Sequence, residues 1–423
     1  MRTRAIRLIV SVLGLALAFG ASVGRADVQP GDVVTKDTFD KAKDLVSPGI
    51  EWCVRHGMQM KIVPYKKIEW NKAYREATEK YAGQVKLAAD GRSLVGHVAG
   101  MPFPNLDPND PQFALKTMWN YEYKPFVTDD EDLRNFDADT GPVADTTPMQ
   151  VERHFLLDHL RTLLWNGRII VDPKPERPNP DQVRGKSSLH PILEPFDLKG
   201  VGSTSIRYLS PDRQDDTWLY LPTLRRVRRL SSAQRSDALF GQDTDVDSYG
   251  GYAGQIPWFD WKYLGEKTML GSFHSEAFPV KYCDGAGDFI FCDTWEKRKV
   301  WVIEGVSKLP QYAYGKRVLF IDQETYLVAY SDIYDRSGHL WKVWVNQWGF
   351  KKRATSSYGT EYPDEMPFQP SITMVDMQLS HATRAALPSN KFPGEEGWYF
   401  NQGEKTGLTE EFFTVAELIA SGH

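Results

Sequence analysis

The chain has 423 residues, with 51 Lys and Arg against 56 Asp and Glu, so its formal net charge at pH 7 is −5. This acidic balance argues against general nucleic-acid binding, because that binding depends on neutralising phosphates. Aromatic residues make up 13% of the chain and include 13 Trp, which is enough for a large core or an apolar cavity. The length is typical of two or more domains, but one large β-architecture with capping helices also accounts for it.

Residues 1–26 have the three-part layout of a secretory signal peptide. Three arginines come first, an apolar run extends from Leu8 to Phe19, and small residues lead to Ala26. The run is too short for a comfortable membrane span, and no later segment approaches 18 apolar residues. We expect cleavage after Ala26, with an uncleaved anchor as the alternative. Cleavage removes four arginines and no acid, which changes the formal charge from −5 to −9. In a Gram-negative bacterium the mature, soluble protein would reach the periplasm.

The first part of the mature chain, 27–170, is expected to be a helix-rich capping part. The predicted elements are a short helix over 36–45 that is stopped by Pro48, a helix over 67–81, a strand over 84–88 and a helix that starts at Asp110. Acidic, turn-rich residues 124–147 predict a surface loop. The clearest helix is predicted over 148–166, because Thr147 can cap it, Pro148 suits its first position and Gly167 can end it. This helix would pack on the core or form a lid over a cavity.

A long connector rich in proline and charge is expected over 172–196. Beyond it, from 195 to 385, short segments with strand character alternate with turns, which predicts an antiparallel meander. The turn DRSG at 335–338 joins two of these strands in a predicted hairpin. Residues 386–423 form a C-terminal segment. We expect 27–423 to be one domain.

Both faces of the predicted sheet are largely apolar. In YLVAYSDIY, alternation puts Tyr326, Val328, Tyr330 and Tyr334 on one side of the strand. The next strand, LWKVWVNQW, carries Trp341. A sheet with one solvated face should show polar residues at alternate positions. The sheet is therefore expected to be a sandwich or a curved sheet whose inner face is roofed by helices and binds an apolar ligand.

Motifs for catalysis and for metal binding are missing from the sequence. It contains no G-x-S-x-G, H-E-x-x-H, C-x-x-C or phosphate-binding loop, and its histidines lack ligand spacing. We expect no catalytic residue, no metal and no cofactor. In an oxidising compartment Cys283 and Cys292 can pair across the turn DGAGD or remain free. Cys53 is expected to be a buried free thiol.

Four arginines follow an apolar strand in TWLYLPTLRRVRRL, residues 217–230. Strand alternation puts Arg226 and Arg228 on one face, and Arg225 and Arg229 on the other. Because an unpaired buried guanidinium is costly, at least one pair should lie at the surface. There it would meet anionic headgroups or an acidic partner. The alternative is internal pairing with nearby aspartates such as Asp215, Asp216, Asp237 and Asp243.

The region 215–267 around these arginines resembles a bacterial secreted family called domain of unknown function 1329, which is related to the lipoprotein-sorting proteins LolA and LolB. Further segments that carry the resemblance are GMPFPNLDP (100–108), Trp119–Asn120, PFDLKGVGSTSIRY (195–208) and LFIDQETYLVAYSDIYDRSGHLWKV (319–343). The resemblance covers about 95–390. It implies an α+β fold: a curved antiparallel half-barrel with helices on its concave face and an apolar cavity between them. It also implies periplasmic handling of a lipid, often beside an inner-membrane transporter of the resistance-nodulation-division superfamily.

Taken together, these patterns favour a periplasmic protein that binds or shuttles a lipid or lipophilic molecule without catalysis. The expected cavity wall is Trp218, Tyr220, Tyr326, Tyr330 and Trp341, and the expected contacts to headgroups or a partner are Arg225, Arg226, Arg228 and Arg229. Two alternatives stay open. One is a periplasmic hydrolase of a lipid or glycan, which needs a buried polar cluster in the cavity. The other is a carbohydrate-binding or scaffold protein, which needs exposed tryptophans.

Overall fold

The computed structural model describes residues 27–230, 235–355, 358–392 and 394–422. The predicted signal peptide lies outside these residues. The helices are α1 (Pro48–Arg55), α2 (Lys72–Tyr81), α3 (Phe113–Glu122) and α4 (Val415–Ala420). The strands before the arginine-rich segment are β1 (Val33–Val34), β2 (Met60–Ile62), β3 (Lys86–Leu87), β4 (Leu94–Val95), β5 (Asp130–Pro142), β6 (Arg153–Leu164), β7 (Val183–Leu189), β8 (Ile192–Glu194), β9 (Gly202–Tyr208) and β10 (Asp216–Leu221). The later strands are β11 (Arg226–Arg229), β12 (Phe259–Gly271), β13 (Asp293–Ser307), β14 (Lys316–Asp322), β15 (Val328–Tyr334), β16 (Leu340–Lys351), β17 (Met366–Asp376), β18 (His381–Ala386) and β19 (Trp398–Phe400).

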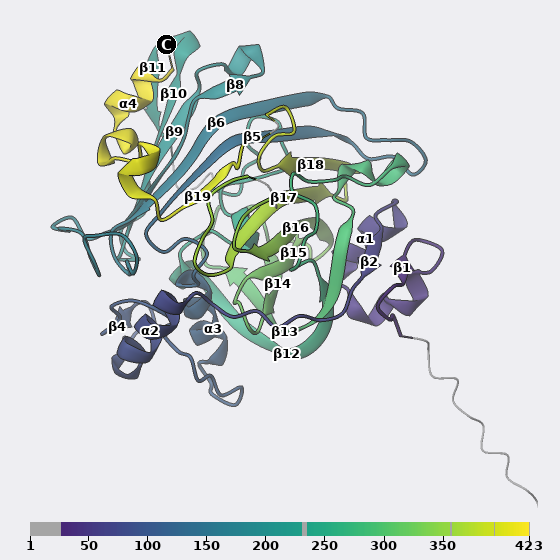
Figure 1. Cartoon of the computed structure of the whole chain (residues 1–423), viewed down its shortest axis with the longest axis horizontal. Helices are drawn as coiled ribbons and strands as arrows, with labels where there is room; N and C mark the ends of the chain where they lie inside the picture. The colour runs from purple at the N-terminus through teal and green to yellow at the C-terminus, as the bar shows by residue number, and fades with distance from the viewer. Residues whose placement is uncertain (1–26, 231–234, 356–357, 393, 423) are drawn as a thin grey trace, which may run out of the picture.

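One curved sheet of 17 strands forms most of the molecule (Figure 1). Antiparallel neighbours run from β12 through β18 in chain order, and β18 then pairs with β5. The sheet continues through β6, β7, β9 and β10 to β11. Within the described residues β11 and β12 do not pair, so the sheet is curved but not closed. This confirms the predicted α+β fold with an open antiparallel sheet and the predicted β15–β16 hairpin.

Side chains of β13 alternate between two separate cores. Val300 and Val302 pack in a core that includes Ile50 and Val54 of α1. Ile303 packs in the other core, which includes Phe113 and Met118 of α3. The helices α1 and α3 therefore cover opposite faces of the sheet, which we call the α1 face and the α3 face. Both faces are covered, as the two-sided apolar strands predict.

Strands β5, β6, β7, β9, β10 and β11 extend beyond the body of the sheet, and we call them the wing (Figure 1). The C-terminal residues 403–422 cover the α1 face of the wing. The Arg161 guanidinium donates to the carbonyl of Thr406, and the Thr204 hydroxyl donates to the carbonyl of Phe413 at 3.1 Å. Leu418 of α4 has no exposed surface. The C-terminal segment thus covers the α1 face of the wing and leaves the α3 face of the wing uncovered by residues 403–422.

The predicted helix over 148–166 is wrong, because most of it is the strand β6. The leucines of this segment occur at helical spacing, yet they divide between two faces of a sheet. Leu163 packs with Phe413 of the C-terminal segment, whereas Leu160 packs against the α3-face core. With no helix here, neither the core-packing helix nor the lid exists, and 27–170 contains two of the longest strands.

The predicted surface loop over 124–147 is also wrong, because it contains β5. Its acids are not solvent-exposed loop residues: Asp132 is fully buried and paired with Arg161 at 3.0 Å, and Asp139 pairs with Arg384 at 3.1 Å. Arginines distant in the sequence thus neutralise the aspartates of β5, which allows this acidic segment to form a strand inside the sheet. The connector over 172–196 likewise contains β7 and β8.

Two of the three helices predicted near the N-terminus are confirmed, and both begin at Lys72 or later in the structure. The predicted helices over 67–81 and from Asp110 correspond to α2 and α3, with later starts. The helix over 36–45 is wrong, since only two short 3₁₀ turns form there. Pro48 begins α1 rather than ending a helix, because the Ser47 hydroxyl caps it by accepting the Ile50 N–H at 3.3 Å.

Candidate functional site

The predicted cavity wall is divided between the two faces of the sheet. Trp218 and Tyr220 lie on the α1 face of the wing, where Tyr220 is 2% exposed and packs next to Gly422 beyond α4. Tyr326 packs in the α3-face core, but Tyr330 packs in the α1-face core. A register shift in β15 between these two tyrosines reverses the alternation that the sequence suggested.

Trp341 is fixed in place rather than lining an opening. Its indole N–H donates to Asp376 at 2.8 Å, and its ring lies edge-on to Tyr314 at 5.3 Å. The structure therefore does not bring the five predicted wall residues together. Each of Tyr220, Tyr326 and Tyr330 is covered by packed neighbours.

The α3 face of the wing instead carries a row of leucines that runs across the strands. Directly opposed residues of antiparallel strands share a face. The register joins Leu133 to Leu160, Leu160 to Leu189, Leu189 to Ser203 and Ser203 to Leu219. At the edge strand, Leu219 is paired with Arg228. One lateral row thus consists of leucines, interrupted by Ser203, and ends at a cation at the edge of the sheet.

A second row runs beside the first and has the same design. Phe136 is paired with Leu157, which is paired with Ile192. The Ile192 N–H donates to the carbonyl of Val201 at 2.8 Å, which brings β9 into the row. Leu221 of β10 is paired with Arg226 of β11. Two apolar rows therefore end at two arginines on the same face.

Four leucines of these rows remain partly exposed, and we call them the leucine strip: Leu160, Leu189, Leu219 and Leu221. Strands lie about 4.8 Å apart, so four steps from Leu160 to Arg228 span roughly 19 Å. Half of a bilayer's hydrocarbon core is about 15 Å, which is the length of one acyl layer. The strip is thus long enough for one acyl chain.

The arginines differ in what they contact. Arg229 pairs with Asp216, so internal pairing accounts for this one. Arg225, Arg226 and Arg228 are exposed and have no ion-pair partner among the residues that the structure describes. The predicted two-and-two division is wrong for Arg225, which lies before β11 in a left-handed turn. Two of the other aspartates pair elsewhere: Asp215 with Arg207 and Arg235, and Asp243 with His381.

A polar row borders the leucine strip. It consists of Glu131, Thr162, Ser187, Ser205 and Thr217, joined by the strand register. Burial and, to a lesser extent, the neighbouring carboxylate of Asp132 raise the pKa of Glu131 to about 8. At neutral pH Glu131 is therefore mostly protonated and adds little negative charge to this face.

The segment that follows β11 fills another part of the α3 face. Tyr252, Ile256 and Trp258 belong to the α3-face core, and the Tyr121 hydroxyl of α3 donates to the carbonyl of Tyr252. The run DTDVD within this segment is held by internal bonds. Asp247 pairs with Arg235, and Asp245 accepts from the Tyr314 hydroxyl at 2.6 Å. These bonds explain the run without a bound cation.

A possible metal cluster is formed by Asp137, Asp139 and His154. Two protein cations already occupy its surroundings. Arg384 pairs with Asp139 at 3.1 Å, and Lys391 Nζ lies 2.8 Å from His154 Nε2. These cations neutralise the acids, so the cluster is better explained as a structural network.

The cysteines play no part in these sites. Cys283 and Cys292 form a disulfide, with the Cα atoms 4.6 Å apart. Cys53 is a buried free thiol in α1. Burial raises the pKa of Cys53 far above its usual range, which keeps it protonated and unreactive.

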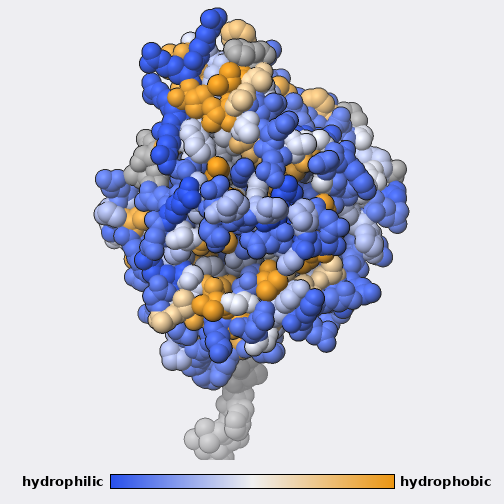
Figure 2. Space-filling view, turned by 90° about the vertical axis from the view of Figure 1, so that its left-hand side faces the viewer, coloured by the Kyte–Doolittle hydropathy of each residue, from blue (hydrophilic) through white to orange (hydrophobic). Residues whose placement is uncertain are grey.

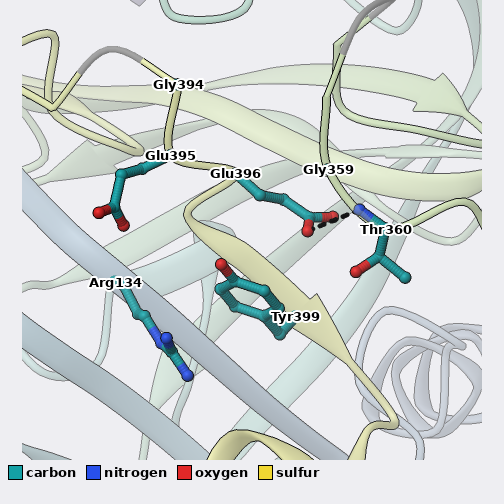
Figure 3. A pocket seen from close by; sticks show the side chains of 7 residues that line it. All are labelled: Arg134, Gly359, Thr360, Gly394, Glu395, Glu396 and Tyr399. Atoms are coloured by element: carbon teal, nitrogen blue, oxygen red, sulfur yellow. Dashed lines mark hydrogen bonds between the residues drawn. The ribbon is translucent and has the colours of Figure 1, made fainter.

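Two hollows lie away from the leucine strip. One, of about 550 Å³, is polar and open, and Figure 3 shows Arg134, Glu395, Glu396 and Tyr399 around it. In it Glu396 accepts the N–H of Thr360 at 2.8 Å. The other, of about 500 Å³, lies between α2 and the proline-rich loop that contains GMPFPNLDP. Neither is lined by a predicted site residue.

Sequence reasoning missed the leucine strip for identifiable reasons. Leu160 lay in the supposed helix, and Leu189 in the supposed connector. Leu219 and Leu221 alternate with Trp218 and Tyr220, and the larger aromatic side chains favour the other face as a cavity wall. Part of the signal was present: alternation groups Leu219 with Leu221 and Arg226 with Arg228, and the turn between β10 and β11 places the two pairs opposite each other.

Comparison with known proteins identifies relatives of this chain. A family model described as "Protein of unknown function (DUF1329)" matches residues 33–418. The uncharacterized Pseudomonas aeruginosa protein PA3922 is 27% identical over 338 residues, which cover 75% of this chain and 69% of that protein.

Three solved structures show a partial likeness to this chain. A candidate outer membrane lipoprotein-sorting protein domain from Vibrio parahaemolyticus is 18% identical, with a TM-score of 0.48, over 72% of this chain and 98% of that one. A DUF1329 family protein from Desulfovibrio piger is 15% identical, with a TM-score of 0.45, over 69% and 92%. A LolA superfamily protein from Nitrosomonas europaea is 15% identical, with a TM-score of 0.39, over 69% and 93%.

Proposed function

The chain belongs to the DUF1329 family, and we propose that it binds a lipid or other lipophilic molecule with an anionic headgroup on the leucine strip. The observation that carries this proposal is that two rows made mostly of aliphatic side chains end at Arg226 and Arg228, which are exposed and share the face of the leucines. An amphiphile with an anionic head matches this arrangement, because its apolar tail can lie along the leucines while its head meets the arginines.

The physical basis is the pairing of two interactions. Covering the exposed parts of the leucines removes apolar surface from water, at about 25 cal/mol per Å². Arginine donates bidentate hydrogen bonds to phosphate or carboxylate, which fixes the headgroup at the sheet edge. The aliphatic rows supply affinity, and the arginines supply orientation.

The proposal includes a location in the periplasm. The leader-like residues 1–26 and the disulfide between Cys283 and Cys292 both fit an oxidising compartment. None of the described helices has the length and apolar content needed to cross a membrane. The family resemblance makes a transporter of the resistance-nodulation-division superfamily the expected partner that delivers or receives the ligand.

A binding experiment with two fluorescent probes tests the assignment of the arginines. One probe is cis-parinaric acid, which has an acyl chain and a carboxylate, and the other is the neutral dye Nile red. Replacing Arg226 and Arg228 by Ser should weaken cis-parinaric acid binding about tenfold or more, because charge-assisted hydrogen bonds contribute about 1.5–3 kcal/mol each.

The same double variant should bind Nile red almost unchanged, because the leucines are intact. Arg213→Ser is the control, since Arg213 lies on the turn at the other end of β9 and β10. Equal weakening of both probes in the R226S/R228S variant, or no weakening of either, would contradict the assigned headgroup site.

A further inference from the structure

Two neighbouring turns at one end of the wing expose large apolar side chains. Phe196, in the 3₁₀ turn Phe196–Leu198, is 92% exposed, and Leu224, in the 3₁₀ turn Pro222–Leu224, is 51% exposed. The turns are adjacent, because a Cβ added at Gly200 would lie 3.1 Å from Pro222. Hydrophobic residues gather at the upper end of the molecule in Figure 2, the end that carries β10, β11 and α4 in Figure 1.

Cations surround these two side chains. Lys199, Arg225, Arg226 and Arg228 are exposed and have no ion-pair partner among the described residues. The acid on the first turn, Asp197, is neutralised by Arg153. The surface around Phe196 and Leu224 is therefore positively charged, although the formal net charge of the chain is −5.

Arg225 occupies a backbone position that favours glycine. It has φ 49° and ψ 40°, in the left-handed region, directly after the turn that carries Leu224. That conformation costs roughly 1–2 kcal/mol for a residue with a Cβ.

We propose that this end, which we call the tip (Pro195–Lys199 and Pro222–Arg228), docks on the surface of an anionic lipid bilayer. Phe196 and Leu224 insert among the headgroups, and the four cations contact lipid phosphates. Amphipathic surfaces bind membranes by this combination of inserted apolar groups and attraction to anionic lipid. A protein partner fits less well, because a stable protein interface needs a larger continuous area than two short turns offer.

This inference deepens the proposed function, because docking would place the edge arginines next to the source of the ligand. The two surfaces are nevertheless built from different apolar residues. Phe196 and Leu224 belong to turns, whereas the leucine strip lies on strands. Docking and ligand binding can therefore fail separately.

Vesicle co-sedimentation tests the tip. The full chain, expressed and processed in a Gram-negative bacterium, is mixed with vesicles of phosphatidylcholine alone or of phosphatidylcholine with phosphatidylglycerol. We expect binding to the anionic vesicles that weakens with added salt. Replacing Phe196 and Leu224 together by Ser should reduce the partition coefficient about tenfold or more. The matched control is Leu379→Ser, since Leu379 is 74% exposed on the β17–β18 turn and should leave binding unchanged.

Charge is tested separately with Arg225→Gly, which suits the left-handed turn and so preserves the fold. Its partition coefficient should fall about fivefold on anionic vesicles only, as expected for one cation near such a surface. The proposal would be overturned if the wild type does not bind vesicles or if the F196S/L224S variant binds them as well as the wild type. If the wild type does not bind, an acidic protein partner becomes the occupant to test. The F196S/L224S variant should still bind cis-parinaric acid. A wild type that binds vesicles but fails to bind cis-parinaric acid would contradict the leucine strip and not the tip.

Discussion

Asp332 illustrates how a single buried residue couples the sheet to α1. Its carboxyl has no contact with solvent, accepts the Ser47 hydroxyl at 2.8 Å and lies 3.4 Å from the Gly49 N–H. Burial raises the pKa of Asp332 from 3.8 to about 7, although these hydrogen bonds oppose the shift. The neighbouring Cys53 and Tyr330 have pKa values raised far above this range.

The raised pKa predicts a pH dependence of stability. The folded state holds a proton on Asp332 that the unfolded chain releases near pH 4, so this stabilising contribution is complete below about pH 4 and is lost as pH rises through about 7. The loss is about 1.4 kcal/mol per pH unit within that window. Asp332→Asn, which cannot ionise, should therefore lose less unfolding free energy between those pH values, as measured by urea denaturation.

Asp335→Asn is the control for this slope. Asp335 lies on the exposed β15–β16 turn, and the backbone N–H of His339 lowers its pKa below 3.8, outside the window. If the wild type and the D332N variant have parallel profiles between pH 4 and 7, Asp332 does not carry the buried proton.

Individual residues also show where the sequence was informative. Alternation in TWLYLPTLRRVRRL predicted that Arg226 and Arg228 share a face, and the register of β11 agrees. The same alternation is broken in β15 by a register shift that no local pattern marks. Tyr326 and Tyr330 were therefore assigned to one wall, although they lie on opposite faces.

At the scale of elements, strands with local partners were predictable and strands with distant partners were not. The β15–β16 hairpin is closed by a short turn, and DRSG marks it. In contrast, β5 owes its stability to β6 on one side and to β18 on the other, more than 200 residues later in the chain. Its paired aspartates look like loop residues until Arg161 and Arg384 are placed beside them.

The two faces of β10 should respond differently to mutation. Tyr220 is buried beneath the C-terminal segment, so Tyr220→Ala should lower the unfolding free energy by about 3 kcal/mol through lost burial and a cavity. Leu219 is partly exposed, and Leu219→Ala should cost about 1 kcal/mol. Chemical denaturation measures both values. Equal costs would mean that the leucine face is as tightly covered as the tyrosine face.

At the scale of the whole molecule, the curved sheet separates three tasks. Its body packs two cores on opposite faces, with α1 on one and α3 on the other. The wing uses the C-terminal segment to cover one face and presents partly exposed leucines on the other. The tip adds exposed apolar and cationic side chains at the end of the wing. Fold and family were predictable because the motifs are local, whereas the leucine face of the wing depends on register across six strands.

Native mass spectrometry of the protein, purified from the periplasm without detergent and followed by lipid extraction, tests the central claim most directly. We predict a stoichiometric co-purified amphiphile with an anionic headgroup in the wild type and in Trp218→Leu, whose change lies on the opposite face of β10. The double variant Leu189→Ser with Leu219→Ser should carry little or none of it. A wild type that is free of ligand and also fails to bind cis-parinaric acid, or a double variant that retains the full load, would contradict lipid binding on the leucine strip.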